Sequence, residues 1–286
     1  MPFSLSFSSV AKNLEKGITR SRMATRELKA MTEAYSLFSG SSGNSYFIKS
    51  GNTSILIDAG KSTSSITKGL RAVGSDLSDI SAIFITHAHS DHTSALPVLL
   101  KKYGGYVYCS FDTFHHLTDG GIDPARLLHF DAGSSVVIGE IEVKSYPSPH
   151  DISGSVCYRA VCGDGTNIAV ATDIGYVSDE VFDCLYGADA AVVESNHDVA
   201  MLKNGPYPQF LKSRILSDRG HLSNENCARL LPRLAMGGTG IFVLGHLSAE
   251  NNDAVLARRC AERALEGLGC SVRVALRSEV VEICKK

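Results

Sequence analysis

No apolar stretch in this 286-residue sequence approaches the roughly 18 residues that a membrane-spanning helix needs. The sequence also has no internal repeat and, after residue 34, no low-complexity linker. Hydrophobic residues make up 44% and charged residues 20%, as in ordinary globular proteins, which excludes disordered, collagen-like and coiled-coil chains. We therefore expect a soluble globular protein without membrane contact, and one large domain is the simplest arrangement for this length.

An excess of either charge is missing as well. The 28 Lys and Arg residues nearly balance the 30 Asp and Glu residues, which leaves a net charge of −2 at pH 7. A nucleic-acid partner would have to be held by a local basic patch, because the protein has no global positive field.

The eight cysteines include no CxxC pair, and no apolar signal segment precedes them. Disulfide frameworks are typical of much shorter secreted chains. Because most of these cysteines lie in apolar stretches, we expect reduced, buried thiols in a cytoplasmic protein.

Residues 1–30 differ from the rest of the chain. They contain six Lys or Arg residues, two Glu and five Ser, but few large apolar residues and no strand pattern. A second methionine, Met31, stands just before the patterned sequence. We predict a flexible extension over residues 1–33 and a single domain over residues 34–286.

Short β-rich runs and helical patterns interleave from residue 35 onward. The expected strands are 46–49, 54–58, 82–86, 106–109, 135–138, 141–145, 156–161, 167–172, 190–194, 240–244 and 272–275. The expected helices, with apolar residues near 3.6 spacing, are 64–73, 95–102, 178–186, 224–236 and 253–268. Hairpins in the first half and alternation with helices later predict an α/β fold of two sheets covered by helices.

A histidine cluster follows the apolar strand 82–86. Residues 87–92 read His-Ala-His-Ser-Asp-His, which places four possible metal ligands within six residues. A solvated polar turn is the plain alternative, but three histidines and an aspartate at this spacing favour metal binding. At a strand end, His87 and His89 can point one way and Asp91 and His92 another, which suits two cations side by side.

Further ligand candidates stand near the ends of later strands. His150 lies just before strand 156–161, Asp173 directly follows the run 167–172, and His246 lies just after strand 240–244. Taken singly, His150 and His246 are more typical of ordinary loop histidines. Their shared placement favours a binuclear site, which needs about seven or eight donors including water.

These motifs resemble the metallo-β-lactamase-fold hydrolases, whose pattern is H-x-H-x-D-H followed by a later His, Asp and His. The resemblance covers about residues 34–286 and implies an αββα four-layer sandwich. It implies two divalent metal ions, and zinc, manganese and iron all suit His and Asp ligands. It also implies seven ligands, with Asp173 bridging both ions: His87, His89 and His150 for the first ion, and Asp91, His92 and His246 for the second.

Several branches of the family share these ligands. Binuclear lactamases of the common type carry Cys where this chain has Asp173, and glyoxalase II-like thioester hydrolases carry a T-x-G-H third motif; neither is seen here. His150 followed by 156–159 is similar to the third motif of ribonuclease Z and its DNA-processing relatives, with Cys157 in place of the usual glycine. The short spacing from His150 to Asp173, 23 positions, leaves no room for the flexible arm of ribonuclease Z.

Two later motifs resemble those that supply a proton donor in the phosphodiesterase branch. Glu194 and His221 would together protonate the leaving alkoxide. The plain alternatives are a strand-end carboxylate for Glu194 and a helix-start histidine for His221.

The full set of motifs resembles the YycJ (WalJ) type of bacterial metallo-β-lactamase-fold exonuclease. Ala88 departs from the Glu that this type commonly has between the first two histidines. The resemblance implies 5′ to 3′ digestion of DNA. The motifs that carry it, in order, are 36–45, 56–60, 86–87, 172–176, 194–198 and 214–218.

The predicted reaction is metal-dependent hydrolysis of a phosphodiester. Two cations would share a hydroxide, lower its pKa toward neutrality and neutralise charge on the phosphodiester, while Asp91 could also accept a hydrogen bond from that hydroxide. One alternative is a small-molecule hydrolase of the same fold that acts on a cyclic phosphodiester or a thioester. Another is a non-catalytic scaffold, against which the seven intact ligands argue.

Two segments offer candidates for substrate binding. The glycine-flanked loop 40–44 could face a phosphate, although a plain β-turn is equally compatible. The stretch 203–214 is expected to be a loop whose aromatic residue stacks on a base and whose cations take phosphates, with Phe210 and Leu211 as alternative anchors to the core. The candidates are Ser41, Ser42, Asn44, Tyr207, Lys212 and Arg214.

Overall fold

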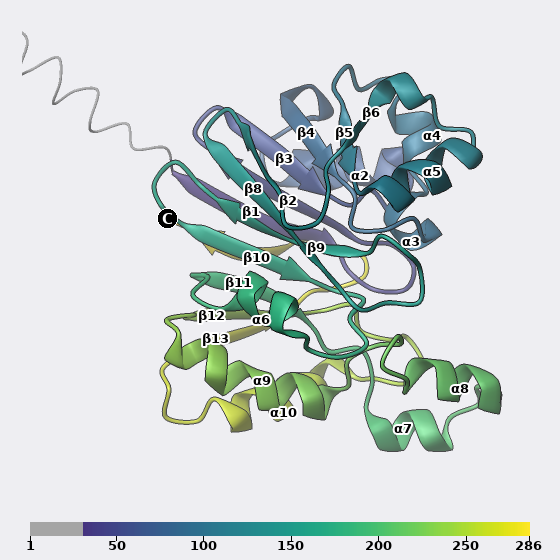
Figure 1. Ribbon diagram of the computed structural model, residues 1–286. Helices are drawn as coiled ribbons and strands as arrows, with labels where there is room; N and C mark the ends of the chain where they lie inside the picture. The colour runs from purple at the N-terminus through teal and green to yellow at the C-terminus, as the bar shows by residue number, and fades with distance from the viewer. Residues whose placement is uncertain (1–30) are drawn as a thin grey trace, which may run out of the picture.

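The computed structural model describes residues 31–286, so the prediction for residues 1–30 lies outside the described part (Figure 1). Two seven-stranded sheets form the centre of the fold. The first sheet has the order β14 (Val281–Lys285), β1 (Thr32–Phe38), β2 (Ser45–Ser50), β3 (Thr53–Ile57), β4 (Ile80–Phe84), β5 (Val107–Cys109) and β6 (Leu127–His129). The second has the order β13 (Ser271–Val274), β12 (Ile241–Gly245), β11 (Ala190–Glu194), β10 (Asn167–Ala171), β9 (Val156–Val161), β8 (Ile141–Pro147) and β7 (Ser135–Ile138).

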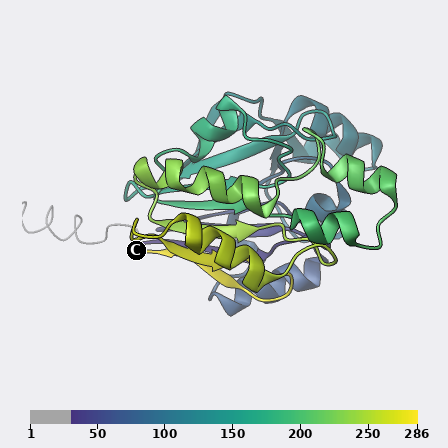
Figure 2. The same cartoon turned by 90° about the horizontal axis from the view of Figure 1, so that it is seen from below.

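Helices cover the outer face of each sheet. Those on the side of the first sheet are α2 (Thr63–Ala72), α3 (Ser90–Thr93), α4 (Leu96–Leu99) and α5 (Phe111–Asp119). Those of the second half are α6 (Asp179–Leu185), α7 (Val199–Asn204), α8 (Gln209–Ile215), α9 (Asn224–Met236) and α10 (Ala254–Ala264). Figure 2 shows α9 and α10 side by side across the second sheet.

Three apolar clusters correspond to the three interfaces between these layers. One cluster joins the inner faces of the two sheets, for example Phe84 of β4 with Tyr158 of β9. A second packs the outer face of the first sheet on α2 and α4, and a third packs the second sheet on α6, α9 and α10. The arrangement is therefore the αββα sandwich that the sequence predicts.

Strand β4 illustrates how the sequence builds these layers. Ala82 and Phe84 face the inter-sheet core, whereas Ile83 faces the helices, because successive side chains of a strand point to opposite faces. A strand buried on both sides reads as a continuous apolar run, and its polar residues begin where it leaves the core. That point is Thr86, directly before His87.

Several predicted boundaries are wrong. Thr32 and Glu33 belong to β1, where they pair with Ser50 and Lys285, so the ordered sheet begins two residues before the predicted domain boundary. Strands β1, β6 and β14 and helix α5 were not expected from the sequence, and the predicted helix 95–102 is reduced to α4. The predicted loop 203–214 is mostly helical, since it contains the end of α7 and most of α8.

Candidate metal centre

The predicted metal ligands converge at one end of the two sheets. His87 to His92 follow β4, His150 follows β8, Asp173 follows β10 and His246 follows β12. Three residues other than glycine have a positive φ in the part of the chain that the structure describes, namely Asp58 (64°), Asp173 (56°) and His246 (54°). Each lies just beyond a strand, so a left-handed backbone turn ends β3, β10 and β12 at the site.

The first group of donors consists of His87, His89 and His150. Nε2 of His87 lies 3.1 Å from Nδ1 of His89, which lies 3.3 Å from Nε2 of His150. Two nitrogen ligands at about 2.0–2.1 Å from a tetrahedral zinc ion are separated by about 3.4 Å, so this spacing fits metal ligation. Burial lowers the pKa of all three imidazoles and keeps them neutral, as metal binding requires.

Contacts at Nδ1 orient two of these three imidazole rings. Nδ1 of His150 donates to the carbonyl of Gly220 at 3.2 Å, and Nδ1 of His87 lies 3.0 Å from the Thr86 hydroxyl. A hydrogen bond at Nδ1 fixes the tautomer and leaves the Nε2 lone pair free for a metal.

The second group consists of Asp91, His92, Asp173 and His246, whose donor atoms lie within 4.8 Å of one another. Nε2 of His92 lies 3.1 Å from Oδ2 of Asp173, and Nε2 of His246 lies 3.3 Å from Oδ2 of Asp91. The mixture of imidazole and carboxylate donors suits a divalent cation.

Asp173 occupies the position between the two groups. Its Oδ1 lies 3.2 Å from Nδ1 of His246 in the second group and 3.9 Å from Nε2 of His150 in the first. Its Oδ2 is buried and lies 3.1 Å from Nε2 of His92, but no contact in residues 31–286 gives it a hydrogen bond of good geometry. A buried carboxylate oxygen without a partner is costly unless a cation or water satisfies it, so the residues present fit the metals that the family resemblance implies.

Asp58 is hydrogen-bonded to His92 of the second group and was assigned no role from the sequence. Its carboxylate is fully buried, accepts a hydrogen bond from Nδ1 of His92 at 2.7 Å, and accepts two more from the backbone and hydroxyl of Thr86. Although burial opposes the charged imidazole, Asp58 and Asp173 raise the pKa of His92 well above its usual value. The signal in the sequence was the position of Asp58 directly after β3.

Glu194 and His221 are in contact, as expected for a proton-donor pair. Oε1 of Glu194 lies 2.8 Å from Nδ1 of His221 and 3.0 Å from Nδ1 of His246, and Oε2 accepts from the backbone of Ile174 and Leu222. Burial alone would raise the pKa of Glu194, but the two histidines lower it to about 2. Burial likewise opposes the charge of His221, but Glu194 raises the pKa of His221 above its usual value.

The three substrate-binding candidates of the loop 40–44 differ in exposure: two face solvent and one is buried at the site. Ser41 and Ser42 are exposed, and Ser42 accepts a hydrogen bond from Lys61 at 2.8 Å. Asn44 is fully buried, and its Nδ2 lies 3.0 Å from Nε2 of His92 and 3.4 Å from Oδ2 of Asp91. Asn44 therefore contacts the metal-ligand candidates themselves, and its contact with substrate stays a prediction.

Of the candidates on α8, Arg214 is linked to the first donor group through Asp151. Lys212 donates to the carbonyl of Lys203 at 2.8 Å, and the guanidinium of Arg214 pairs with Asp151. Oδ1 of Asp151 lies 3.4 Å from Nε2 of both His89 and His150.

Tyr207 is half-buried on the connection between α7 and α8. Phe210 is 75% exposed, so it does not anchor this segment to the core as the sequence allowed. The roles of Tyr207, Lys212 and Arg214 in substrate binding stay predictions.

The family follows from comparison with known sequences. The model of the beta-lactamase superfamily domain matches residues 53–247. Exodeoxyribonuclease WalJ of Streptococcus pneumoniae is 39% identical over 225 residues, covering 77% of this chain and 83% of that protein. Exodeoxyribonuclease YycJ of Bacillus anthracis is 38% identical over 239 residues, covering 82% and 90%. The chain therefore belongs to the beta-lactamase superfamily and, within it, to the family of WalJ and YycJ.

A solved structure supports the fold independently. The metallo-beta-lactamase fold protein YhfI from Bacillus subtilis aligns with a TM-score of 0.69 at 16% identity, covering 89% of this chain and all of that one. At this identity the likeness concerns the fold alone. In residues 31–286, no helix combines the length and the apolar character that crossing a membrane demands.

Proposed function

We propose that this protein is a metal-dependent exonuclease that digests DNA from the 5′ end. The observation that carries the proposal is the convergence of two donor groups, with Asp173 belonging to the second and lying 3.9 Å from His150 of the first, and with His221 and Glu194 beside them. Two relatives that cover most of the chain are named exodeoxyribonucleases, which supports a phosphodiester substrate and DNA in particular.

The two donor groups would hold two divalent ions, one with His87, His89 and His150 and one with Asp91, His92 and His246, with Asp173 shared. Bound there, such ions supply Lewis acidity toward a phosphoryl oxygen and lower the pKa of water. Zinc, manganese and iron are the proposed candidates, because imidazole and carboxylate ligands accept each of them.

His221 is the proposed general acid. Its Nδ1 donates to Glu194, so its Nε2–H is left to protonate the leaving oxygen. Glu194 is fully buried and its oxygens are already engaged by two histidines and two backbone amides, which makes it a positioning residue that keeps His221 protonated. Asp91, whose side chain is 21% exposed, remains a proposed ligand that can also accept a hydrogen bond from the attacking water.

We place the protein in the cytoplasm. The eight cysteines, all within residues 31–286, are free thiols, and six of them are buried. Free thiols in this number suit a reducing compartment.

The test is a digestion of 5′-labelled and 3′-labelled DNA by the metal-loaded protein, combined with metal analysis. We expect about two metal ions per chain and early release of labelled mononucleotides from the 5′-labelled strand alone. Stripping the metals with a chelator should abolish digestion, and adding them back should restore it. Intact DNA beside rapid hydrolysis of a thioester would contradict the proposal.

A further inference from the structure

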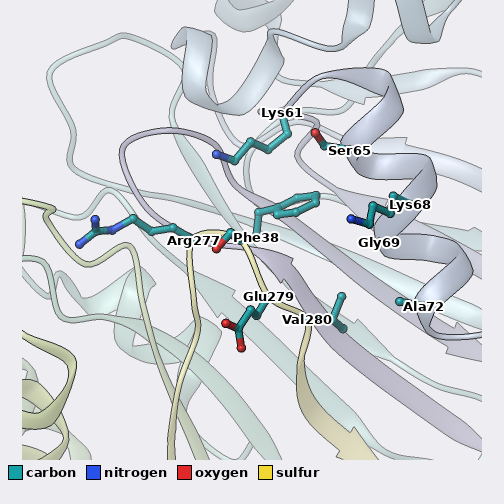
Figure 3. Close-up of a pocket in the computed structure, with 10 residues that line it drawn as sticks. Phe38, Lys61, Ser65, Lys68, Gly69, Ala72, Arg277, Glu279 and Val280 are labelled. Atoms are coloured by element: carbon teal, nitrogen blue, oxygen red, sulfur yellow. The ribbon is translucent and has the colours of Figure 1, made fainter.

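A pocket of about 420 Å³ lies between α2 and the segment 277–280 (Figure 3). Lys61 and Lys68 form its α2 side, Phe38 its floor, and Arg277 and Val280 its opposite side. We refer to it as the α2 pocket. None of these five residues was a site candidate from the sequence.

The α2 pocket is a local basic patch in a protein without net positive charge. Three of its lining residues are cationic and one, Glu279, is acidic. The Lys and Arg ion pairs found among residues 31–286 involve other side chains, so Lys61, Lys68 and Arg277 have no carboxylate within 4 Å. Lys61 and Arg277 donate instead to the neutral oxygens of Ser42 and Ser248, and Lys68 is exposed, so an anionic ligand can compete for these charges.

The pocket is joined to the metal centre through Lys61 and the loop 40–44. Lys61 follows Gly60, whose backbone packs so closely on Asp91 that a Cβ on Gly60 would lie 1.6 Å from the Asp91 carbonyl oxygen. The amine of Lys61 binds Ser42, which is two residues, or at most about 7 Å of extended chain, from Asn44. Asn44 in turn contacts Asp91 and His92.

The opposite side of the pocket is joined to the second donor group as well. The side chain of Arg277 packs on Gly40, where an added Cβ would lie 3.1 Å from Cγ of Arg277. Its guanidinium donates to the carbonyl of Ser248, two residues beyond His246. Residues on both sides of the α2 pocket thus contact segments that lead directly to the second donor group, which contains Asp91, His92 and His246.

An apolar floor accompanies these charges. The amine of Lys61 lies 6.0 Å from the centre of the Phe38 ring, and Ala72 and Val280 complete the apolar lining. In Figure 3 the side chain of Lys68 reaches from α2 toward Phe38, and that of Lys61 extends from the segment before α2 past the Phe38 ring. Cations beside an apolar, partly aromatic surface are the combination with which proteins hold the phosphates and bases of a single nucleic-acid strand.

We infer that the α2 pocket binds the DNA strand next to the bond being cut, with phosphates on Lys61 and Lys68 and a base against Ala72, Val280 and the 7% of Phe38 that is exposed. This inference rests on the proposed function and adds the path of the strand to it. The strand then runs from the metal centre across the loop 40–44 into the pocket.

The test compares two substrates for the metal-loaded full chain. A single-stranded 20-mer fills both the metal centre and the pocket, whereas bis(p-nitrophenyl) phosphate occupies the metal centre alone. The double variant Lys61→Ala/Lys68→Ala should lower kcat/KM for the 20-mer at least tenfold and leave the small diester within twofold. The matched control is Lys144→Ala, which removes an exposed lysine paired with Glu142 on β8 and should change neither substrate.

Salt dependence gives a second readout. The slope of log K against log salt falls by about 0.7 for each phosphate contact to a single strand, so the double variant should be shallower by about 1.4. Lys68→Glu, at an exposed position that folding does not depend on, should weaken the 20-mer more than Lys68→Ala does. In the wild type, kcat/KM should rise with length from a dinucleotide until the pocket is filled.

Each result separates the inference from the proposed function. An unchanged 20-mer rate and salt slope in the double variant, with DNA digestion intact, would overturn the strand path alone. Equal loss on both substrates would also overturn it, because the lysines would then act through the metal centre. A mononucleotide that inhibits the wild type but not the double variant, with unchanged DNA kinetics, would make the pocket a nucleotide site instead. Failure of the wild type to digest DNA would reject the proposed function itself.

Discussion

The two flanks of the metal centre carry similar numbers of cations but use them differently. On the α8 flank, Arg214 pairs with Asp151 and Lys212 donates to a backbone carbonyl. In the α2 pocket, Lys61 donates to the hydroxyl of Ser42, Lys68 is exposed, and no carboxylate comes within 4 Å of either lysine among the described residues. A cation already engaged inside the protein contributes less to binding an incoming phosphate, since it must first give up its partner.

The difference shows that the number of basic residues in a segment does not identify a phosphate-binding surface. The stretch 203–214 has the same density of cations as the segment 61–68, three in 12 residues against two in 8, and it adds two aromatic residues. Yet its charges help to hold α7, α8 and Asp151 in place. Four substitutions test the comparison: two in the metal centre itself and one on each of its two flanks.

Asp173→Ala should have the largest effect, because it removes the carboxylate that lies between both donor groups. We expect loss of both metals and activity at background level, so that neither flank matters any longer. Metal analysis and DNA digestion of the purified variant measure this. Full retention of two metals per chain would show that Asp173 bridges nothing.

His221→Ala should lower turnover roughly 100-fold or more, the scale of a missing general acid, with the metal content unchanged. Nδ1 of His221 faces Glu194, and His221 is outside both donor groups proposed for the metals, although its donor atom also lies near those of Asp173 and His246. Steady-state kinetics beside metal analysis separate the two effects. A parallel loss of metal would make His221 a ligand.

Gly60→Ala should destabilise the connection between the α2 pocket and the centre. The new Cβ would meet the Asp91 carbonyl oxygen at 1.6 Å, so the backbone must shift, and overpacking of this kind costs roughly 1–3 kcal/mol or more. Thermal unfolding should show a lower Tm and weaker metal retention. Gly104→Ala, where an added Cβ has no neighbour within 4 Å, is the control and should leave both unchanged.

Arg214→Ala should have the smallest effect. Its pair with Asp151 is 55% exposed on the Arg side, and exposed pairs contribute about 0–1 kcal/mol. We expect a Tm close to that of the wild type and a smaller change in salt slope than Lys68→Ala gives. A larger change in salt slope for Arg214→Ala than for Lys68→Ala would indicate that the DNA strand binds on the α8 flank instead.

The convergence of the candidate ligands was predictable from the sequence because each of them follows an apolar strand, and strand ends meet at one edge of the sandwich. Asp58 was not predictable as the partner of His92, since the two are 34 residues apart and meet only through the parallel pairing of β3 with β4. Helices α7 and α8, of six and seven residues, are too short for a helical period to be recognised. Whether a lysine such as Lys68 or Lys212 has a partner inside the protein depends on tertiary contacts that no local pattern records.

The three left-handed turns at Asp58, Asp173 and His246 also bear on how this protein would respond to laboratory evolution. A side chain in that conformation costs on the order of 1–3 kcal/mol, which glycine would largely avoid. A screen for heat resistance that ignores activity should therefore favour glycine at these positions among its early hits. Each such hit would gain stability and lose a carboxylate or imidazole from the centre, so screens on this scaffold need selection for nuclease activity in every round.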